Sequence, residues 1–155
     1  MEKSYDFGKL RKLITIYYVV QAFLVGLLVY VGVGFQMKMR SIGRPDQFTK
    51  SALAALALQL VLFFLINRFA RSEAEREVES SAAPVTTEQQ GAFRKKRLVG
   101  DFIKAGVFVF FVTFIMRAPD VPLVQCTLFI TFILTFLSYF QCYNFAAKRL
   151  MKAKR

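Results

Sequence analysis

Apolar residues are gathered into four long runs along the chain, and most charged residues lie between these runs. The runs cover approximately residues 13–35, 51–69, 98–117 and 121–145. A helix needs about 20 mostly apolar residues to cross a hydrocarbon core that is roughly 30 Å thick. Each run is about that long, so the pattern predicts four membrane-spanning helices.

Helices are the expected form of these runs, because backbone polar groups inside lipid must be bonded within the segment. A transmembrane barrel would need short strands of alternating polarity, and these runs do not alternate. A soluble core helix would carry a polar face at the helical period, whereas residues 107–116 hold Thr113 as their one polar residue. We therefore expect an all-α integral membrane four-helix bundle in which residues 1–155 form one domain.

The connections between the runs differ in length. Residues 36–50 form the first and contain Gly43 and Pro45, which indicate a turn. Residues 70–97 form a long linker, which we expect to begin as a continuation of the second helix and to become flexible between Ser80 and Gln90. Within it, residues 86–89 fit a capping box that would start a new helix.

The third and fourth runs are separated by residues 117–122 alone, which predicts a tight antiparallel helical hairpin. The second run carries several small residues that permit close backbone approach, and we expect it at the centre of the bundle; these are Ser51, Ala52, Ala54, Ala55 and Ala57. Gln21 and Gln59 are single polar residues at middle depth. An amide hydrogen bond between them is expected to contribute roughly 0.6–2 kcal/mol.

The fourth run carries a narrow polar stripe made of Thr127, Thr131, Thr135, Ser138, Gln141 and Cys142. At the helical repeat these residues fall within about 120° of arc. Stripes of this kind usually pack against another helix and bond across it. A face that lines a permeation path or a ligand site is the alternative.

The distribution of basic residues predicts orientation. Of 22 Lys and Arg residues, 16 lie in the N-terminal segment, the linker and the C-terminal tail, and these include Lys3 and Arg155. Basic residues concentrate on the cytoplasmic side of a membrane. Both termini are therefore expected in the cytoplasm, with the protein in a bacterial inner membrane or, in an organelle, facing the matrix or stroma.

Two basic clusters lie at the ends of the predicted spans: Lys38, Arg40 and Arg44 in the first connection, and Arg94, Lys95, Lys96 and Arg97 before the third run. We expect both clusters to contact anionic lipid headgroups. An acidic partner subunit is the alternative for the first cluster. Nucleic-acid binding is not expected, because these charges follow the ends of the spans rather than a folded basic surface.

The residue types available for chemistry are few. The sequence has no histidine, which removes imidazole metal ligation and histidine-based catalysis. Cys126 and Cys142 lie about 24 Å apart along a helix, well beyond the roughly 7 Å that a disulfide allows. We predict no catalytic, metal or cofactor site, and no enzymatic activity.

Asp101 and Lys104 are the only charged residues in the interior of a predicted span, since Arg68 and Arg117 lie at span ends. Their spacing of three places them on one helical face near the membrane surface, where Lys104 can extend to the interface. The simpler interpretation is an interfacial ion pair, and the alternative is a proton or cation site.

Residues 100–104, with the sequence Gly-Asp-Phe-Ile-Lys, resemble a Gly-acid-x-x-Lys stretch of the ATP synthase I accessory family of small four-span proteins. The resemblance covers five residues. The connection after the first run is longer here, and the second run lacks that family's Gly and Asn features, so the resemblance implies no function.

Two hypotheses of function follow. The first is a non-catalytic multi-pass subunit or assembly factor that binds other integral membrane subunits and anionic lipids. The second is a small oligomeric transporter or channel for an ion or small solute, built around the polar stripe of the fourth run.

Overall fold

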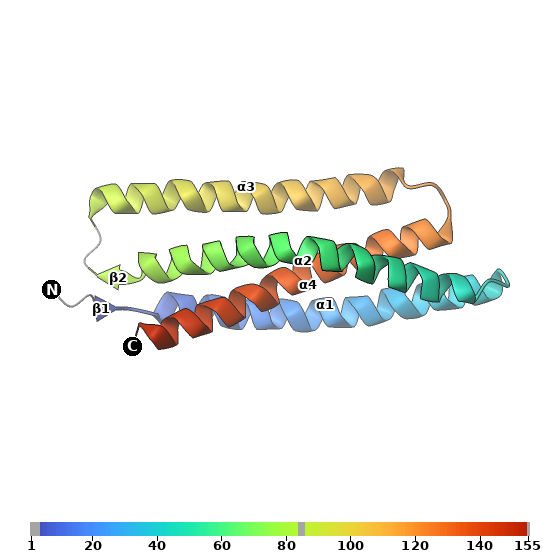
Figure 1. Cartoon of the computed structure of the whole chain (residues 1–155), viewed down its shortest axis with the longest axis horizontal. Helices are drawn as coiled ribbons and strands as arrows, with labels where there is room; N and C mark the ends of the chain where they lie inside the picture. Colours follow the sequence, from blue (N-terminus) through green and yellow to red (C-terminus); the bar gives the residue numbers. More distant parts are fainter. Residues whose placement is uncertain (1–3, 84–85, 155) are drawn as a thin grey trace.

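The computed structural model describes residues 4–83 and 86–154, and four long helices account for most of them (Figure 1). The helices are α1 (Gly8–Ser41), α2 (Asp46–Ser80), α3 (Thr87–Arg117) and α4 (Pro122–Ala153). Each is long and apolar enough to cross a membrane. The chain is therefore all-α with four candidate spans, as the hydrophobic pattern predicts. Lys3 and Arg155, which entered the charge count, lie outside the described residues.

The helices extend well past the apolar runs. The predicted first connection, residues 36–50, is wrong in length, because α1 continues to Ser41 and α2 already begins at Asp46. Gly43 adopts a positive φ of 75° and ends α1. The backbone amide of Gly43 donates to the carbonyl of Arg40, and that of Arg44 donates to the carbonyl of Met39. These two hydrogen bonds form a Schellman motif.

The linker is more ordered than the sequence predicts. α2 continues to Ser80, as expected from its helix-forming residues. The capping box at the start of α3 is confirmed, with the Thr86 hydroxyl accepting from the Gln89 amide. A short antiparallel strand pair joins β1 (Ser4–Tyr5) to β2 (Ala82–Ala83). Part of the segment expected to be flexible is thus held by the N-terminal residues.

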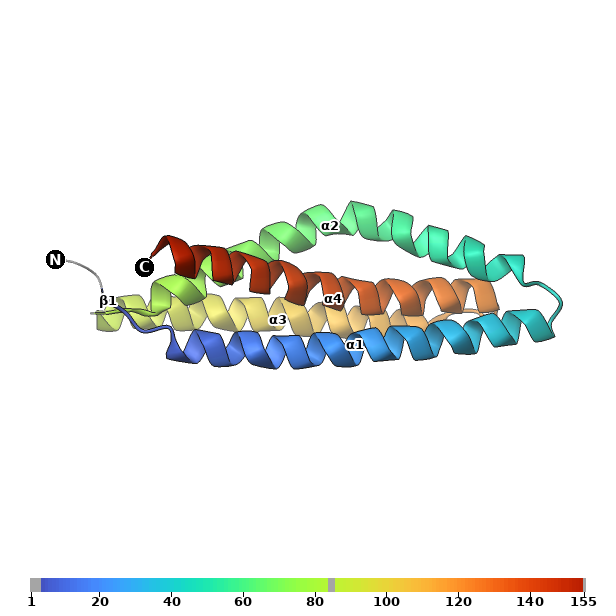
Figure 2. The same ribbon diagram turned by 90° about the horizontal axis from the view of Figure 1, so that it is seen from below.

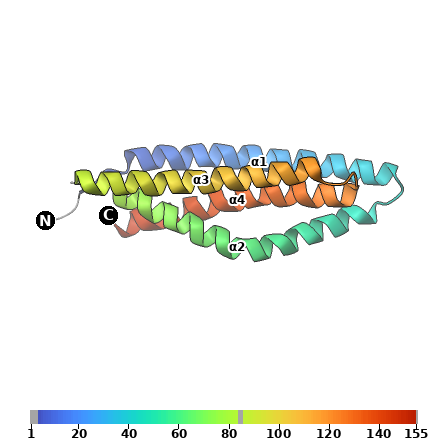
Figure 3. The same ribbon diagram turned by 90° about the horizontal axis from the view of Figure 1, so that it is seen from above.

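The helix at the centre of the bundle is α4, which packs against the other three helices. The expectation that the second span is central is wrong. In the most apolar 18-residue stretch of each helix, 39% of the residues of α4 are buried, against 11% of those of α2. Of the small residues that suggested a central position, Ser51 and Ala55 are fully buried, whereas Ala54 and Ala57 are exposed. Figures 2 and 3 show α2 bowing away from the other helices near its middle.

α3 lies along one side of the bundle (Figure 1) and has fewer contacts with the other helices than α1, α2 or α4. Its connection to α4 is short, but Gly100 and Phe111 are its only buried residues among those described. Phe108 and Phe111 contact the ring of Phe132 on α4. Both described chain ends and the α2–α3 connection lie at one end of the bundle (Figure 1).

Two buried clusters form the core. The larger lies where the chain ends meet and includes Leu10, Ala74, Tyr139 and Tyr143, drawn from α1, α2 and α4. The smaller includes Met39, Ala55, Cys126 and Ile130 near the opposite end. Both cysteines are free thiols, as their spacing predicts.

Candidate functional site

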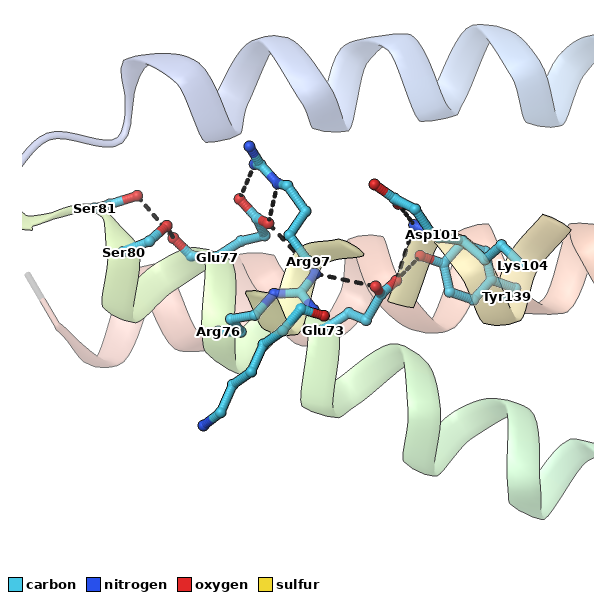
Figure 4. Close-up of polar contacts among 10 residues, drawn as sticks. Glu73, Arg76, Glu77, Ser80, Ser81, Arg97, Asp101, Lys104 and Tyr139 are labelled. Carbon is cyan, nitrogen blue, oxygen red and sulfur yellow. Dashed lines mark hydrogen bonds and ion pairs between the residues drawn. The ribbon is translucent and has the colours of Figure 1, made fainter. Parts of the chain in front are cut away.

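The most distinctive polar site is an ion cluster centred on Glu73, at the junction of α2, α3 and α4 (Figure 4). The Glu73 side chain is 4% exposed and has three polar partners. Arg76 donates to its Oε1 at 3.0 Å, and the Lys104 ammonium lies 3.3 Å from its Oε2. The Tyr139 hydroxyl on α4 donates to the same Oε2. One carboxylate therefore joins three helices.

A second carboxylate extends the cluster toward the chain ends. Arg97 on α3 donates to both oxygens of Glu77 on α2, at 3.1 and 2.6 Å. Arg76 lies between the two carboxylates and also donates to the backbone carbonyl of Lys96, at 2.7 Å. The ions of α2 thus bind both the side chains and the backbone of α3 (Figure 4).

Gly100 allows α3 to approach this cluster. A Cβ atom at this position would lie 2.1 Å from Oε1 of Glu73, far inside any normal contact. Glu73 is held by three partners and cannot rotate away without losing them. A glycine at this position therefore permits the ion pairs between α2 and α3.

The predicted pair of Asp101 and Lys104 is present, with the ammonium 2.8 Å from the carboxylate. It is not isolated, because Lys104 also contacts Glu73 and lies 5.8 Å from the centre of the Tyr139 ring. The Asp101 side chain is 58% exposed, whereas that of Lys104 is 28% exposed. Lys104 is therefore the link between the exposed pair and the buried carboxylate.

Sequence reasoning missed Glu73, Arg76 and Glu77, because they lie beyond the second apolar run. It also did not connect Tyr139 with this site, although the side chain is buried in the bundle. A signal was available: Glu73 and Glu77 lie four residues apart beside the small residues Ala70 and Ala74. Four-residue spacing places such pairs on one helical face.

The polar stripe of α4 is divided between two neighbours. Thr127, Thr131 and Thr135 each donate to the carbonyl four residues earlier, at 2.7–2.8 Å. This local bond satisfies a hydroxyl inside lipid. Ser138 faces α2, where it accepts from Gln59. Gln141 instead is exposed and lines a cavity between α1 and α4.

The expected amide bond between Gln21 and Gln59 is wrong. The Nε2 of Gln59 donates to the Ser138 hydroxyl at 2.8 Å. Its Oε1 lies 3.3 Å from the Thr135 hydroxyl, whose single proton it shares with the closer Thr131 carbonyl. Gln21 lines the cavity that also contains Gln141. The reason is helix order: α1 and α2 touch each other little, and each packs mainly on α4.

The contact of Gln59 with α4 can be measured. Gln59→Leu and Ser138→Ala are each expected to lower the free energy of unfolding by roughly 0.6–2 kcal/mol, because each removes one partner of an interhelical hydrogen bond. Denaturant unfolding of the two single variants and the double variant in micelles gives the coupling between them.

Gln21→Leu is the matched control for that cycle, since its amide does not bond to α2 in the described structure. It is expected to cost less than Gln59→Leu and to show no coupling to Ser138. Equal and additive effects of all three substitutions would contradict the assigned contact.

The basic clusters lie at opposite ends of the bundle. Lys38 and Arg40 are exposed in the last turn of α1, and Arg44 is exposed in the turn that follows. The one nearby acid, Asp46, pairs with Lys50 at 2.7 Å. In the second cluster Arg97 pairs with Glu77, whereas Arg94, Lys95 and Lys96 are exposed and form no ion pair within the described residues.

The ion cluster acts as a clamp, by which we mean that its ion pairs and hydrogen bonds hold α2, α3 and α4 together. Both oxygens of Glu73 are engaged by cations or by Tyr139, so neither is available as a base or ligand in this arrangement. Breaking a buried pair by removing one partner is strongly destabilising, because a charge is left uncompensated. The arrangement therefore fastens the otherwise loose α3 to α2 and α4.

Comparison with known proteins gives no further assignment: no family model matches the chain, and no curated protein or solved structure is significantly similar to it.

Proposed function

We propose that the chain is a non-catalytic multi-pass membrane subunit that assembles or stabilises a larger membrane protein complex. The observation that carries this proposal is that the polar groups of two interhelical clusters, around Gln59 and Glu73, bond to one another. Gln59 is bonded to Thr135 and Ser138, and Glu73 is bonded to three partners. These two clusters therefore leave no free carboxylate or amide of their own for catalysis or for a solute. Among the described residues, the Tyr143 hydroxyl and the Asn144 amide are buried without a hydrogen-bond partner, but no carboxylate accompanies them in the cavity that Asn144 lines.

Charge favours an acidic partner at the α1–α2 turn. Lys38, Arg40 and Arg44 are exposed there, and the neighbouring acid is engaged by Lys50. α3 adds a long apolar surface, with Phe102 and Met116 each 79% exposed. We propose that a helix of another integral membrane protein packs on α3 while its acidic connecting segment binds the basic turn.

We further propose that both termini face the cytoplasm of a bacterial inner membrane. The chain ends share one end of the bundle with the α2–α3 connection and the helix turns that flank it, and the corresponding parts of the sequence carry 16 of the 22 basic residues. Such a bias agrees with retention of that end on the cytoplasmic side.

A small oligomeric transporter is the second candidate, and the buried Glu73 is the observation that favours it, since intramembrane ionisable groups often mark ion pathways. It ranks lower because both carboxylate oxygens are already occupied. If the chain is a transporter, vesicles that contain the purified chain must show flux of a solute or an ion across their membrane.

The subunit proposal predicts a stoichiometric complex after extraction with a mild detergent. Photoreactive residues placed at Phe102 on α3 and at Arg44 are expected to crosslink the same second polypeptide, identified by mass spectrometry. A matched position is Phe23, which is 69% exposed on α1 and outside the proposed surface. It is expected to label lipid.

Extraction as a lone monomer, with crosslinks to lipid at all three positions, would contradict the subunit role. The transporter would instead be favoured if vesicles show flux, and if Glu73→Gln abolishes that flux while the variant keeps its fold.

A further inference from the structure

Two cavities lie near the ion cluster, one between α2, α3 and α4 and the other between α2 and α3. The first has a volume of about 370 Å³ and an apolar lining that includes Leu65, Phe69, Ile103, Val107, Phe111 and Phe136. Lys104 and Tyr139 also line it, so it borders the Glu73 site directly. Its volume falls in the range of roughly 300–1,000 Å³ typical of small-molecule sites.

Apart from Lys104 and Tyr139, the described lining of the apolar cavity has no free polar group that could bind a polar ligand. The hydroxyl of Thr135, which lines it, already donates to the Thr131 carbonyl. Because the lining helices are candidate spans, the medium around the cavity is hydrocarbon. The fitting occupant is therefore an alkyl chain.

The second cavity is polar and has a volume of about 580 Å³. Three arginines, Arg76, Arg94 and Arg97, line it together with Glu77 and Asp101. Arg76 and Arg97 are paired with the α2 carboxylates, whereas Arg94 forms no ion pair within the described residues. Lys95 and Lys96 beside it are likewise exposed and unpaired there. This cavity has spare positive charge and suits an anionic group.

The spacing of the two cavities matches one lipid molecule. From Arg94 in the polar cavity to Val107 in the apolar cavity, α3 advances about 20 Å. That is about half of the roughly 40–45 Å thickness of a bilayer with its headgroups. A phospholipid lying along α3 would place its phosphate and its acyl chain in the two cavities at once.

We propose that α2 and α3 form a binding site for one anionic phospholipid, with the phosphate at Arg94 and an acyl chain in the apolar cavity. The chain fills the space beside the loosely packed α3, and the headgroup neutralises the basic start of that helix. The site depends on no part of the proposed subunit function, because it is formed by this chain alone.

The test uses the full chain in phosphatidylcholine vesicles with a small fraction of phosphatidylglycerol that carries a photoreactive diazirine in its acyl chain. Labelling, mapped by tandem mass spectrometry, is expected at Ile103, Val107 and Phe111. Phe102 and Val109, which are 79% and 60% exposed on the same helix, are the matched outward positions and should be labelled less.

Variants separate the two halves of the site. Arg94→Gln is expected to weaken labelling of the cavity by about fivefold, the effect of one basic residue on binding of an anionic lipid. Arg44→Gln, at the opposite end of the bundle, is expected to leave it unchanged. Val107→Trp should fill the cavity and remove its labelling, whereas Val109→Trp should not. Arg94 is exposed, so its substitution is expected to leave the fold intact, which thermal unfolding verifies.

Three outcomes would overturn the proposal. Equal labelling of cavity and outward positions would indicate ordinary surrounding lipid. Equal labelling by a phosphatidylcholine probe would show that the site does not require an anionic headgroup. No labelling of Ile103, Val107 or Phe111 above background would show that no acyl chain occupies the cavity.

Discussion

Glu73→Ala is expected to lower the free energy of unfolding by about 3–5 kcal/mol, the usual cost of removing one partner from a buried ion pair. The substitution leaves Arg76 and Lys104, whose side chains are only 12% and 28% exposed, without their shared carboxylate. It also removes the acceptor of the Tyr139 hydroxyl. Denaturant unfolding of the purified chain in micelles measures the loss.

Glu75→Ala is the matched control, two residues away on the same helix. Its pair with Arg71 is largely exposed, with side chains 45% and 66% accessible, so a loss of at most about 1 kcal/mol is expected. Glu73→Gln keeps the size of the side chain and an acceptor for Tyr139, and should fall between the two. Equal effects of Glu73→Ala and Glu75→Ala would contradict the clamp.

The same variants have a structural readout. Spin labels at Arg71 on α2 and Phe102 on α3, both exposed, report the distance between these helices. If the cluster fastens α3, the distance distribution should broaden in Glu73→Ala and stay narrow in the Glu75 variant. This measurement separates loss of the clamp from a general loss of stability.

Gly100→Ala is expected to destabilise the protein by about 1–3 kcal/mol, as overpacking of a tight contact does. The new methyl group would lie 2.1 Å from Glu73 Oε1 and 3.2 Å from a guanidinium nitrogen of Arg76. Either α3 must move outward or the carboxylate must leave its partners. Unfolding measurements under the same conditions give the change.

Gly106→Ala on the same helix is the matched control, since a Cβ there meets nothing within 4 Å. It is expected to be neutral or to stabilise by about 0.5–1 kcal/mol, because alanine is the better helix former. The two substitutions should therefore differ in sign. Combining Gly100→Ala with Glu73→Ala should remove most of the added cost, because the clashing atom is gone. Stabilisation by both alanines would rule out the close approach.

Local features of this protein followed from the sequence by itself. The four apolar runs determined that four helices form, because backbone groups in hydrocarbon must bond within their own segment. The capping box at Thr86 and the pairing of Asp101 with Lys104 also followed, since both join residues three apart. Such contacts depend on helix geometry alone.

Only the tertiary structure decided which helix is central, which partner Gln59 uses, and that Glu73 is buried beside Gly100 and Tyr139. These contacts join residues far apart in the chain and depend on the order and rotation of the helices. In a soluble protein a polar face would reveal that rotation. In lipid the outward and inward faces are both apolar, so hydrophobicity does not encode which side packs, and close contacts select it instead.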